Sequence, residues 1–406
     1  MDSNGVLCGD ARGRAAGCGF GGDGGEYWMV PTRDEMMLRP ASDPDALGVG
    51  ARLLGEGAVV LMPTETVYAL AVRADDAGAL RRLWRVRGGE ARGALAWHAP
   101  TVERVREVVG VESPVHRRVL SRLLPGGVQL AIEMGEAQRD AVLAKLGVAR
   151  GVMDDEAGLL VRVTSHAAAA ELLGLCAFPV VMAGVGGVRA ARTVEEAVVV
   201  LGERGAMLGG VVDAPVRPAG VGSTLVRLTR DGRYHVARVG LVEERAITRT
   251  MTRTILFVCT GNTCRSPMAS AIARDLLKSD ASGLDTRVLS AGIATGPGAP
   301  ASPEAVEAMR KMGIALDSHA SRPLTRELLT QADIVFAMTR THRTRILQLD
   351  PESAEKVHLL DPSDADVDDP FGQSQEVYDT TAKRMGALIR ERMAQLDALD
   401  PKEHRP

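Results

Sequence analysis

The stretch ILFVCTGNTCRSPM, residues 255–268, constrains the fold of this chain more than any other. It begins with a short, continuous apolar run, which is typical of a buried strand. A loop with a glycine follows, and Ser266-Pro267 is a signal for the start of a helix. The pattern therefore predicts a strand that turns sharply into a helix, with two cysteines and an arginine in the turn.

The segments after this loop alternate between strand-like and helix-like patterns. Short apolar runs fall at 286–292, 332–338 and 356–360, and helical patterns at 268–279, 302–313, 340–349 and 374–396. The helix at 302–313 has Ser302 as its cap and Pro303 at its first position. Such alternation predicts a parallel sheet covered by helices, with sites beyond the carboxyl ends of the strands. The loop after residue 258 lies at such an end.

The loop has the composition of an anion-binding site. Backbone N–H groups near a helix N-terminus can point toward an anion, and the planar guanidinium of Arg265 suits phosphate oxygens. Gly261 and Asn262 tolerate backbone angles that most residues avoid. We therefore expect the surrounding donors to lower the pKa of Cys259, which makes it a nucleophile for a bound phosphoryl group. Ser266 can donate a hydrogen bond to the thiolate and cap the helix.

The alternative interpretation of this loop is a metal site or a structural turn. Cys259 and Cys264 are separated by four residues, which is poor spacing for zinc, and no second pair of cysteines follows. The sequence therefore predicts no metal here and favours the anion-binding interpretation.

The residues VCTGNTCRSPMA resemble the signature of the low-molecular-weight protein tyrosine phosphatase family, Cys-x5-Arg-Ser. The resemblance extends to SAG (290–292), GIALDSHASRPLT (313–325), ADIVFAMTRTHR (332–343) and DDPFGQS (368–374). It implies that Cys259 is the nucleophile, that Arg265 binds the phosphoryl group and that Asp369 is the general acid. It also implies a three-layer α/β/α fold, a phosphoprotein substrate, a phosphocysteine intermediate and no cofactor.

The general acid has three candidates in the sequence. Expelling a poor leaving group needs a proton donor, and a carboxyl beside an anionic phosphate is shifted toward its protonated form. Asp369 precedes Pro370, but Asp368 lies beside it and Asp361 precedes a second proline. The segment DADVDDP could also be an acidic, solvated loop without a catalytic role. The resemblance favours Asp369.

Other residues have supporting roles by the resemblance. Cys264 can trap an oxidised Cys259 as a reversible disulfide. Ser290 and His319 align with positions that hydrogen-bond the loop asparagine in relatives, although a purely structural role for His319 fits the sequence equally well. The loop and supporting residues are Thr260, Gly261, Asn262, Thr263, Cys264, Ser266, Ser290 and His319.

Two branches of the family differ in this loop. Tyrosine phosphatases often carry Ile or Leu at the position of Thr263, whereas protein arginine phosphatases resemble CTGNTCRS closely. Phe371 replaces the Tyr of many tyrosine-specific members. These residues favour phosphoarginine over phosphotyrosine. Thiol-dependent arsenate reductases share the loop but need further cysteines downstream, and no cysteine follows Cys264.

The front half contains a second resemblance. Strand-like segments fall at 58–63, 158–163, 178–184 and 223–228, and 75–87 has a helical pattern. LMPTETVYALAV (61–72) resembles a segment of the YrdC-like threonylcarbamoyl-AMP synthase family. The likeness continues in RVRGGEARGALAWH (85–98), LLPGGVQLAI (123–132), VRVTSH (161–166), GVGSTLVRL (220–228) and ARVG (237–240). It implies an α/β domain with a twisted sheet.

That family binds ATP with Mg²⁺, threonine and bicarbonate, and serves tRNA modification. The matching ligand candidates here are Thr64, Thr66, Tyr68, Arg87, Ser223, Thr224 and Arg238. However, Arg87 and Gly89 stand where the family has a Lys and an Arg, and MAGVGG (182–187) replaces a Ser-Ala-Asn motif. Because Arg is not an equivalent point charge for Lys, these changes favour a degenerate domain that binds a nucleotide or RNA. An active synthase and a non-catalytic interaction module are the other hypotheses.

The chain is therefore interpreted as an α/β fusion protein. We expect a disordered Gly-rich tail at 1–43, a YrdC-like domain at 44–242, a polar linker at 243–253 and a phosphatase domain at 254–400. Met251 and the residues after it resemble the start of an independent protein. The alternative start codons are Met29, Met36 and Met37.

The bulk composition excludes several classes of protein. A net charge of −3 gives no general attraction to nucleic acid or acidic membranes. No apolar run approaches the roughly 20 residues that span a bilayer. Five unevenly placed cysteines argue against a secreted disulfide scaffold. The sequence therefore predicts a cytoplasmic enzyme without a membrane partner.

Overall fold

The computed structural model describes residues 37–38, 44–89, 93–111, 113–186, 190–214, 216–279 and 283–400. The tail expected to be disordered, 1–43, lies outside these residues except for 37–38, which form a strand. The chain divides into two compact units. Unit 1 is Met1–Val111 with Leu123–Glu244, and unit 2 is Glu112–Arg122 with Arg245–Pro406.

Unit 1 contains a mixed sheet with the strand order β1-β9-β2-β3-β8-β4-β7-β5-β10-β11, and β6 pairs with β7. The strands are β1 (Met37–Leu38), β2 (Val60–Pro63), β3 (Tyr68–Arg73), β4 (Ala96–His98), β5 (Val128–Ile132), β6 (Asp154–Asp155), β7 (Gly158–Arg162), β8 (Val180–Gly184), β9 (Gly210–Val212), β10 (Thr224–Leu228) and β11 (Tyr234–Arg238). The strands predicted from the sequence of this half are present as β2, β7, β8 and β10.

The helices of unit 1 are mostly short, and several begin and end at the signals that the sequence carries. They are α2 (Pro44–Gly55), α3 (Ala77–Arg87), α4 (Val102–Val109), α6 (Glu136–Leu146), α7 (Ala167–Gly174), α8 (Val194–Leu201) and the 3₁₀ helix η1 (Gly202–Met207). The predicted helix at 75–87 is α3, which Asp76 caps by accepting the N–H of Gly78. It ends at Gly88, whose left-handed backbone suits glycine.

Unit 2 contains a parallel sheet with the order β13-β12-β14-β15. Its strands are β12 (Arg253–Cys259), β13 (Thr286–Gly292), β14 (Ile334–Ala337) and β15 (Val357–Leu359). Its helices are α5 (Pro114–Leu123), α9 (Glu244–Met251), α10 (Arg265–Leu277), α11 (Pro303–Lys311), α12 (Arg326–Gln331), α13 (Arg340–Leu349), η2 (Pro351–Lys356), α14 (Gln375–Ala394) and α15 (Leu396–Leu399). The last residue of α5, Leu123, and the first residue of α9, Glu244, count with unit 1. The segment 243–253, expected as a linker, thus contains α9 and the start of β12.

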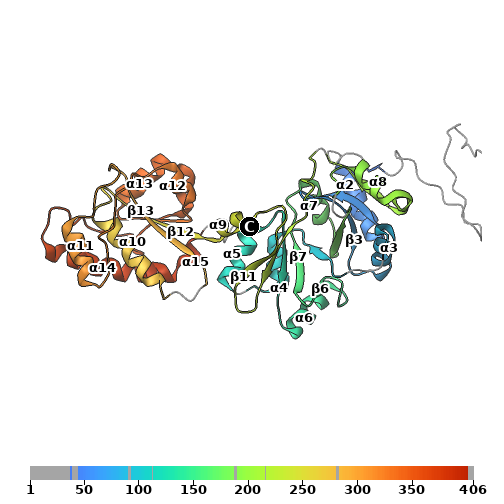
Figure 1. Cartoon of the computed structure of the whole chain (residues 1–406), viewed down its shortest axis with the longest axis horizontal. Coiled ribbons are helices and arrows are strands. Elements are labelled where there is room, and N and C mark those ends of the chain that lie inside the picture. The colour runs from blue at the N-terminus through green and yellow to red at the C-terminus, as the bar shows by residue number, and fades with distance from the viewer. Residues whose placement is uncertain are drawn as a thin grey trace, which may run out of the picture. The chain divides into compact units, whose positions relative to one another are not determined.

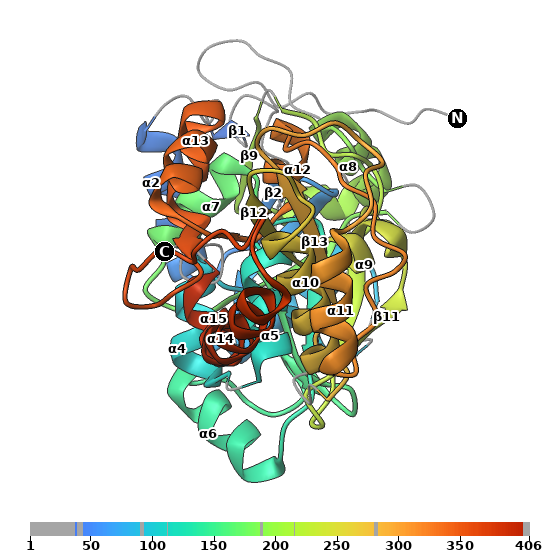
Figure 2. The ribbon, with the colours of Figure 1, turned by 90° about the vertical axis from the view of Figure 1, so that its left-hand side faces the viewer.

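Helices cover both faces of this sheet, as the alternating pattern predicts. Helices α10, α11 and α14 share a core with one face, and α12 and α13 share a core with the other (Figure 1). Helix α14 packs against both α10 and α11, and the three lie together in the turned view (Figure 2). No helix in the described part of the chain is long and apolar enough to cross a membrane.

The central strand β12 explains why the site lies where it does. All seven of its residues are buried, as expected for a parallel strand covered on both faces. Successive side chains point to opposite faces, so Phe257 and Cys259 join the core beneath α10, whereas Leu256 and Val258 join the core beneath α12 and α13. Cys259 therefore ends the strand on the side from which α10 starts.

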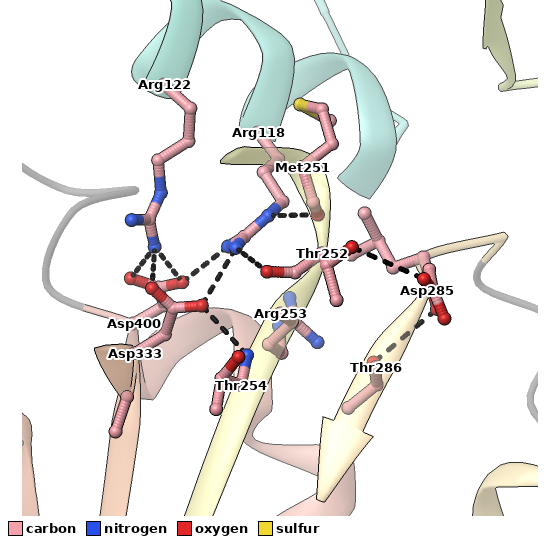
Figure 3. A network of polar contacts seen from close by, with 12 residues as sticks. Arg118, Arg122, Met251, Thr252, Arg253, Thr254, Asp285, Thr286, Asp333 and Asp400 are labelled. Atoms are coloured by element: carbon pink, nitrogen blue, oxygen red, sulfur yellow. Dashed lines mark hydrogen bonds and ion pairs between the residues drawn. The ribbon is translucent and has the colours of Figure 1, made fainter. Parts of the chain in front are cut away.

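At the opposite end of the sheet, four buried charged side chains form a network within unit 2 (Figure 3). Arg118 of α5 lies 2.9 Å from Asp333 and 2.8 Å from Asp400. Arg122 lies 2.9 and 2.7 Å from the same carboxylates. Asp333, which precedes β14, also accepts the backbone N–H of Thr254 in β12 at 2.9 Å. The network thus links α5 to the start of the two central strands.

Candidate active site

The loop between β12 and α10 is held in shape by Asn262. This residue is buried and has a φ of 52°, in the left-handed region that Asn tolerates better than most residues. Its side-chain amide donates to Ser266 Oγ at 2.9 Å, and its Oδ1 accepts the backbone N–H of Arg322 at 2.9 Å. Its carbonyl oxygen lies 2.7 Å from His319 Nε2. The His319 side chain therefore contacts the backbone of the loop asparagine, not its side chain.

No described contact joins Ser290 to Asn262, the residue to which the resemblance implies that it hydrogen-bonds. Ser290 is buried in β13 opposite Phe257, and the described contacts of the Asn262 side chain go to Ser266 and Arg322 instead. Arg322 was missed by the sequence reasoning because its contribution is a backbone N–H, which no residue type reveals.

Cys259 is almost completely buried, with its Sγ 2.9 Å from Ser266 Oγ. Burial raises the pKa of the Cys259 thiol above its ordinary value. Hydrogen bonds from Ser266 and from the Asn262 backbone, with the charge of Arg265, act in the opposite direction. The donors predicted from the sequence are therefore in place, but the prediction of a lowered pKa is wrong because loss of water around the sulfur outweighs them.

Ser266 does not cap the helix as expected. Helix α10 begins at Arg265, and Cys264 is its N-cap residue without a side-chain capping bond. The Ser266 hydroxyl instead contacts the nucleophile and Asn262, and it lies 3.4 Å from the carbonyl oxygen of Ala291. The serine is thus directed at the reacting sulfur rather than at the helix backbone.

Arg265 connects the loop to the segment that carries the candidate acids. Its Nη1 donates to the carbonyl oxygen of Val367 at 3.0 Å, and its Nη2 donates to the carboxylate of Asp369. Asp361 pairs with Arg384 at 3.0 Å, and the exposed Asp368 lies 3.8 Å from the same arginine. Of the three candidate acids, Asp369 is the one in contact with Arg265.

A small cavity of about 180 Å³ lies above this loop. The proposed nucleophile, the arginine and the favoured acid all line it, and Phe371 is largely exposed beside them. The lining residues are Cys259, Thr260, Gly261, Thr263, Cys264, Arg265, Asp369 and Phe371. Within the described residues, no group of His, Cys, Asp or Glu side chains is arranged to hold a metal ion.

Cys264 lies among hydroxyl groups. Its Sγ is 3.3 Å from Tyr378 Oη, 3.5 Å from Ser302 Oγ and 3.6 Å from Thr263 Oγ1, and both loop cysteines are free thiols. Burial, together with the hydrogen bond to Cys264, raises the pKa of Tyr378 to about 12. Tyr378 was also missed by the sequence reasoning, and it lies 114 residues downstream on α14.

His342 is a third residue that the sequence reasoning missed. It is buried at the start of α13, with Nε2 2.9 Å from Thr260 Oγ1. Burial, and then the charge of Arg265, lower its pKa to about 4. The imidazole is therefore neutral near pH 7. Its place in the stretch MTRTHR helped to carry the family resemblance, but that stretch alone does not reveal what the ring contacts.

In unit 1, two of the predicted ligand residues belong to a buried polar cluster. Thr64 and Thr66 have their hydroxyl oxygens 2.9 Å apart, and Arg162 donates to Thr66 Oγ1 at 2.7 Å. Arg162 also pairs with Glu65 at 2.9 Å, and Thr164 donates to the same carboxylate. Arg162 and Glu65 were missed, although both lie inside stretches that carry the family resemblance.

The other ligand residues predicted for unit 1 are less closely associated with the cluster around Thr64 and Thr66. The loop before Ser223 reaches the cluster, because Gly220 donates its backbone N–H to the carbonyl oxygen of Thr66 at 2.8 Å. Tyr68 donates to Asp213 at 2.7 Å, and Arg238 donates to the carbonyl oxygen of Ser223 at 3.3 Å.

Thr224 and Arg87 have local partners. The Thr224 hydroxyl donates to the carbonyl oxygen of Val242 at 2.6 Å and accepts the N–H of Gly240 at 2.9 Å, which ties the segment after β11 to β10. Arg87 is exposed at the end of α3, where its guanidinium lies 5.3 Å from the ring centre of Trp84. None of the described contacts joins Arg87 to the buried threonines.

Comparison with known families defines the class of protein. Residues 254–402 match the low molecular weight phosphotyrosine protein phosphatase family. Residues 52–240 match the Sua5/YciO/YrdC family, which is described as telomere recombination. The chain is therefore a fusion of a Sua5/YrdC domain with a low-molecular-weight protein-tyrosine/arginine phosphatase, as the sequence predicts.

Two relatives support this class by their sequences. The chain is 43% identical over 146 residues to the protein-arginine-phosphatase of Bacillus subtilis strain 168. This match covers 35% of this chain and 95% of the relative. It is 36% identical over 130 residues to a probable low molecular weight protein-tyrosine-phosphatase, EpsP, of Ralstonia solanacearum. That match covers 32% of this chain and 86% of the relative. A crystal structure of a YwlE mutant from Bacillus subtilis is 41% identical, covers 36% of this chain and 98% of its own, and has a TM-score of 0.34. The chain belongs to the low molecular weight phosphotyrosine protein phosphatase family.

Proposed function

We propose that unit 2 hydrolyses phosphoarginine on proteins through a phosphocysteine intermediate. The observation that carries this proposal is the cavity of about 180 Å³ that Cys259, Arg265 and Asp369 line together. A thiol, a guanidinium and a carboxyl beside a helix N-terminus supply the nucleophile, the phosphoryl-binding group and the proton donor that the reaction needs.

The first step transfers the phosphoryl group to the enzyme. The Cys259 thiol first gives its proton to solvent, aided by the donors at Ser266 and the Asn262 backbone and by the charge of Arg265. The thiolate then attacks phosphorus, the P–N bond of phosphoarginine breaks, and Asp369 gives its proton to the departing guanidine nitrogen. In the second step water attacks the phosphocysteine, Asp369 takes a proton from that water, and the S–P bond breaks. Inorganic phosphate leaves, and the thiolate, stabilised by the hydrogen bond from Ser266, is restored.

The contact between Arg265 and Asp369 supports this order of reaction steps. Arg265 Nη2 donates to the Asp369 carboxylate, so a bound phosphoryl group would compete with that carboxylate for the guanidinium. Separation of the two would leave Asp369 beside an anion instead of a cation, which favours its protonated form. Binding of the substrate would therefore prepare the proton donor.

The preference for phosphoarginine rests on two residues that line the cavity. Thr263 supplies a hydroxyl that can contact a guanidine N–H, whereas an aliphatic side chain there would suit an aryl ring. Phe371 gives the mouth an apolar face. The relative from Bacillus subtilis is named as a protein-arginine-phosphatase, whereas the relative from Ralstonia solanacearum is named as a probable tyrosine phosphatase. Phosphotyrosine is therefore the alternative substrate group.

Phosphate release from matched phosphoarginine and phosphotyrosine peptides tests this proposal on the full chain. We expect the phosphoarginine peptide to be the better substrate and Cys259→Ser to abolish release. We expect Thr263→Ile to lower the preference about tenfold, because it removes one hydrogen bond to the leaving group. A preference for phosphotyrosine would overturn the role of Thr263, and no release from either peptide by folded protein would overturn the phosphatase proposal.

For unit 1 we propose a ligand-binding role without synthase turnover. Among the described residues, Arg87 stacks on Trp84 in the exposed part of α3 and Gly89 carries no charge, so these two positions, where the family has cations, bring none to Thr64 and Thr66. The Glu65 carboxylate is instead paired with Arg162. A nucleotide with its Mg²⁺, or RNA, is the ligand class we propose. Formation of threonylcarbamoyl-AMP for tRNA modification is the alternative.

A further inference from the structure

His342 links the phosphate loop to the N-terminal turn of α13. Its Nε2 lies 2.9 Å from Thr260 Oγ1, and its Nδ1 lies 2.8 Å from Thr339 Oγ1. Thr339 is the N-cap residue of α13, and its hydroxyl also accepts the backbone N–H of His342 at 3.2 Å. His342 is only 3% exposed, and protein hydroxyls contact both nitrogens of its ring. The imidazole is therefore held in a fixed orientation.

Thr260 is the residue directly after the nucleophile, and it lines the same cavity as Cys259 and Arg265. Its carbonyl oxygen accepts the backbone N–H of Ala294 at 3.0 Å, so both its backbone and its side chain have protein partners. A threonine hydroxyl offers one donor and two acceptor sites, and His342 uses one of them. When His342 Nε2–H donates to Thr260 Oγ1, the hydroxyl keeps its one O–H donor for a phosphoryl oxygen in the cavity.

We propose that His342 is a positioning residue that fixes the Thr260 hydroxyl as a further hydrogen-bonding group for the phosphoryl oxygens of the substrate. This inference rests on the proposed phosphatase function. A hydroxyl that is free to rotate loses conformational freedom when a ligand binds, and a hydroxyl already held by a buried ring does not. Because every substrate brings the same phosphoryl group, the contribution of the pair is equal for phosphoarginine and phosphotyrosine.

Kinetics of the full chain test the pair with four single variants and one double variant. Thr260→Val and His342→Leu each lower kcat/KM about tenfold, the usual effect of one lost hydrogen bond, and they do so equally for both peptides. The double variant loses no more than either single variant, because both act through one hydroxyl. Thr260→Ser and His342→Gln keep hydrogen-bonding groups and restore most of the activity, so they separate positioning from a failure to fold.

Two substitutions elsewhere in unit 2 are matched controls. Thr344→Val removes an exposed hydroxyl from the same helix, where Thr344 contacts the carbonyl oxygen of Arg340 at 3.0 Å. His358→Leu replaces a histidine that is partly buried, in β15. Both should leave kcat/KM within twofold of the unmodified chain.

Direct binding of vanadate, measured by calorimetry, separates this inference from the proposed function. Affinity for vanadate should fall about tenfold in Thr260→Val and in His342→Leu and recover in the Ser and Gln variants. That result supports the pair even if neither peptide is hydrolysed, an outcome that would overturn only the proposed function. Unchanged vanadate affinity, a loss confined to one peptide, or additive losses in the double variant would each overturn the positioning role.

Discussion

Among single residues, Asp369 is the proton donor that we propose. Its carboxylate contacts Arg265 on one side and the backbone N–H of Phe371, at 3.2 Å, on the other. Replacement by Asn keeps the shape but removes the acidic proton. We expect Asp369→Asn to lower kcat by roughly 10²- to 10⁴-fold on a phosphopeptide, and by less on p-nitrophenyl phosphate, whose leaving group needs little protonation.

The neighbouring carboxylate provides the control for that prediction. Asp368 is 91% exposed in its side chain and lies 3.8 Å from Arg384, outside the cavity lining. Asp368→Asn should change kcat by less than twofold. An equal loss in the two variants would contradict the assignment of the acid to Asp369.

His98 in unit 1 predicts how stability depends on pH. It is buried, and burial, followed by the charge of Arg162, lowers its pKa from 6.5 to about 3. Between these pH values the unfolded chain binds the proton and the folded chain does not. The free energy of unfolding of unit 1 should therefore fall as the pH falls from 6.5 toward 3, by about 1.4 kcal/mol per pH unit.

Urea unfolding of the full chain, followed by tryptophan fluorescence, measures this slope because Trp84 and Trp97 both lie in unit 1. His98→Gln removes the titrating group, so its unfolding free energy should depend less steeply on pH in this window. The same slope in both proteins would show that other groups produce the acid sensitivity.

Among the helices and strands, α5 illustrates an element whose role depends on distant residues. Arg118 is fully buried between Asp333 and Asp400, so Arg118→Met leaves two buried carboxylates with one cation fewer. Breaking a buried pair in this way costs about 3–5 kcal/mol. We expect hydrogen exchange of the β12 and β14 amides to become faster, because Asp333 also binds the N–H of Thr254.

An exposed arginine gives the comparison for this change. Arg104 and Glu107 form an ion pair at 3.1 Å with side chains 48% and 65% exposed. Arg104→Met should cost at most about 1 kcal/mol and leave exchange in unit 2 unchanged. Similar effects of the two substitutions would contradict the importance of the buried network.

Helix α11 shows the opposite case, an element that local sequence predicts well. Ser302 accepts the N–H of Ala305 at 3.3 Å and Pro303 stands in the first turn, as the sequence indicates. These signals act within one turn of the chain, so no tertiary information is needed to find them. By contrast, α5 lies inside the stretch that matches the Sua5/YrdC family, yet it counts with unit 2 because of partners more than 200 residues away.

At the scale of the whole molecule, the fusion raises the question of what unit 1 contributes. If unit 1 binds a nucleotide without turnover, ATP with Mg²⁺ should raise the unfolding temperature of unit 1, because a ligand of the folded state stabilises it. Addition of threonine and bicarbonate should then produce no pyrophosphate above the rate without enzyme. Threonine-dependent release of pyrophosphate would favour the bifunctional enzyme, and absence of a thermal shift would favour an interaction module.

The sequence by itself determined the two families, the α/β class of each half and the loop from Cys259 to Ser266. These features depend on residue types at fixed, short spacing, which a single chain displays directly. Only the tertiary structure decided which of three aspartates meets Arg265, that Arg322 and His342 hold the loop, and that burial raises the pKa of Cys259. Such features depend on contacts between distant segments and on the exclusion of water, which no local pattern encodes.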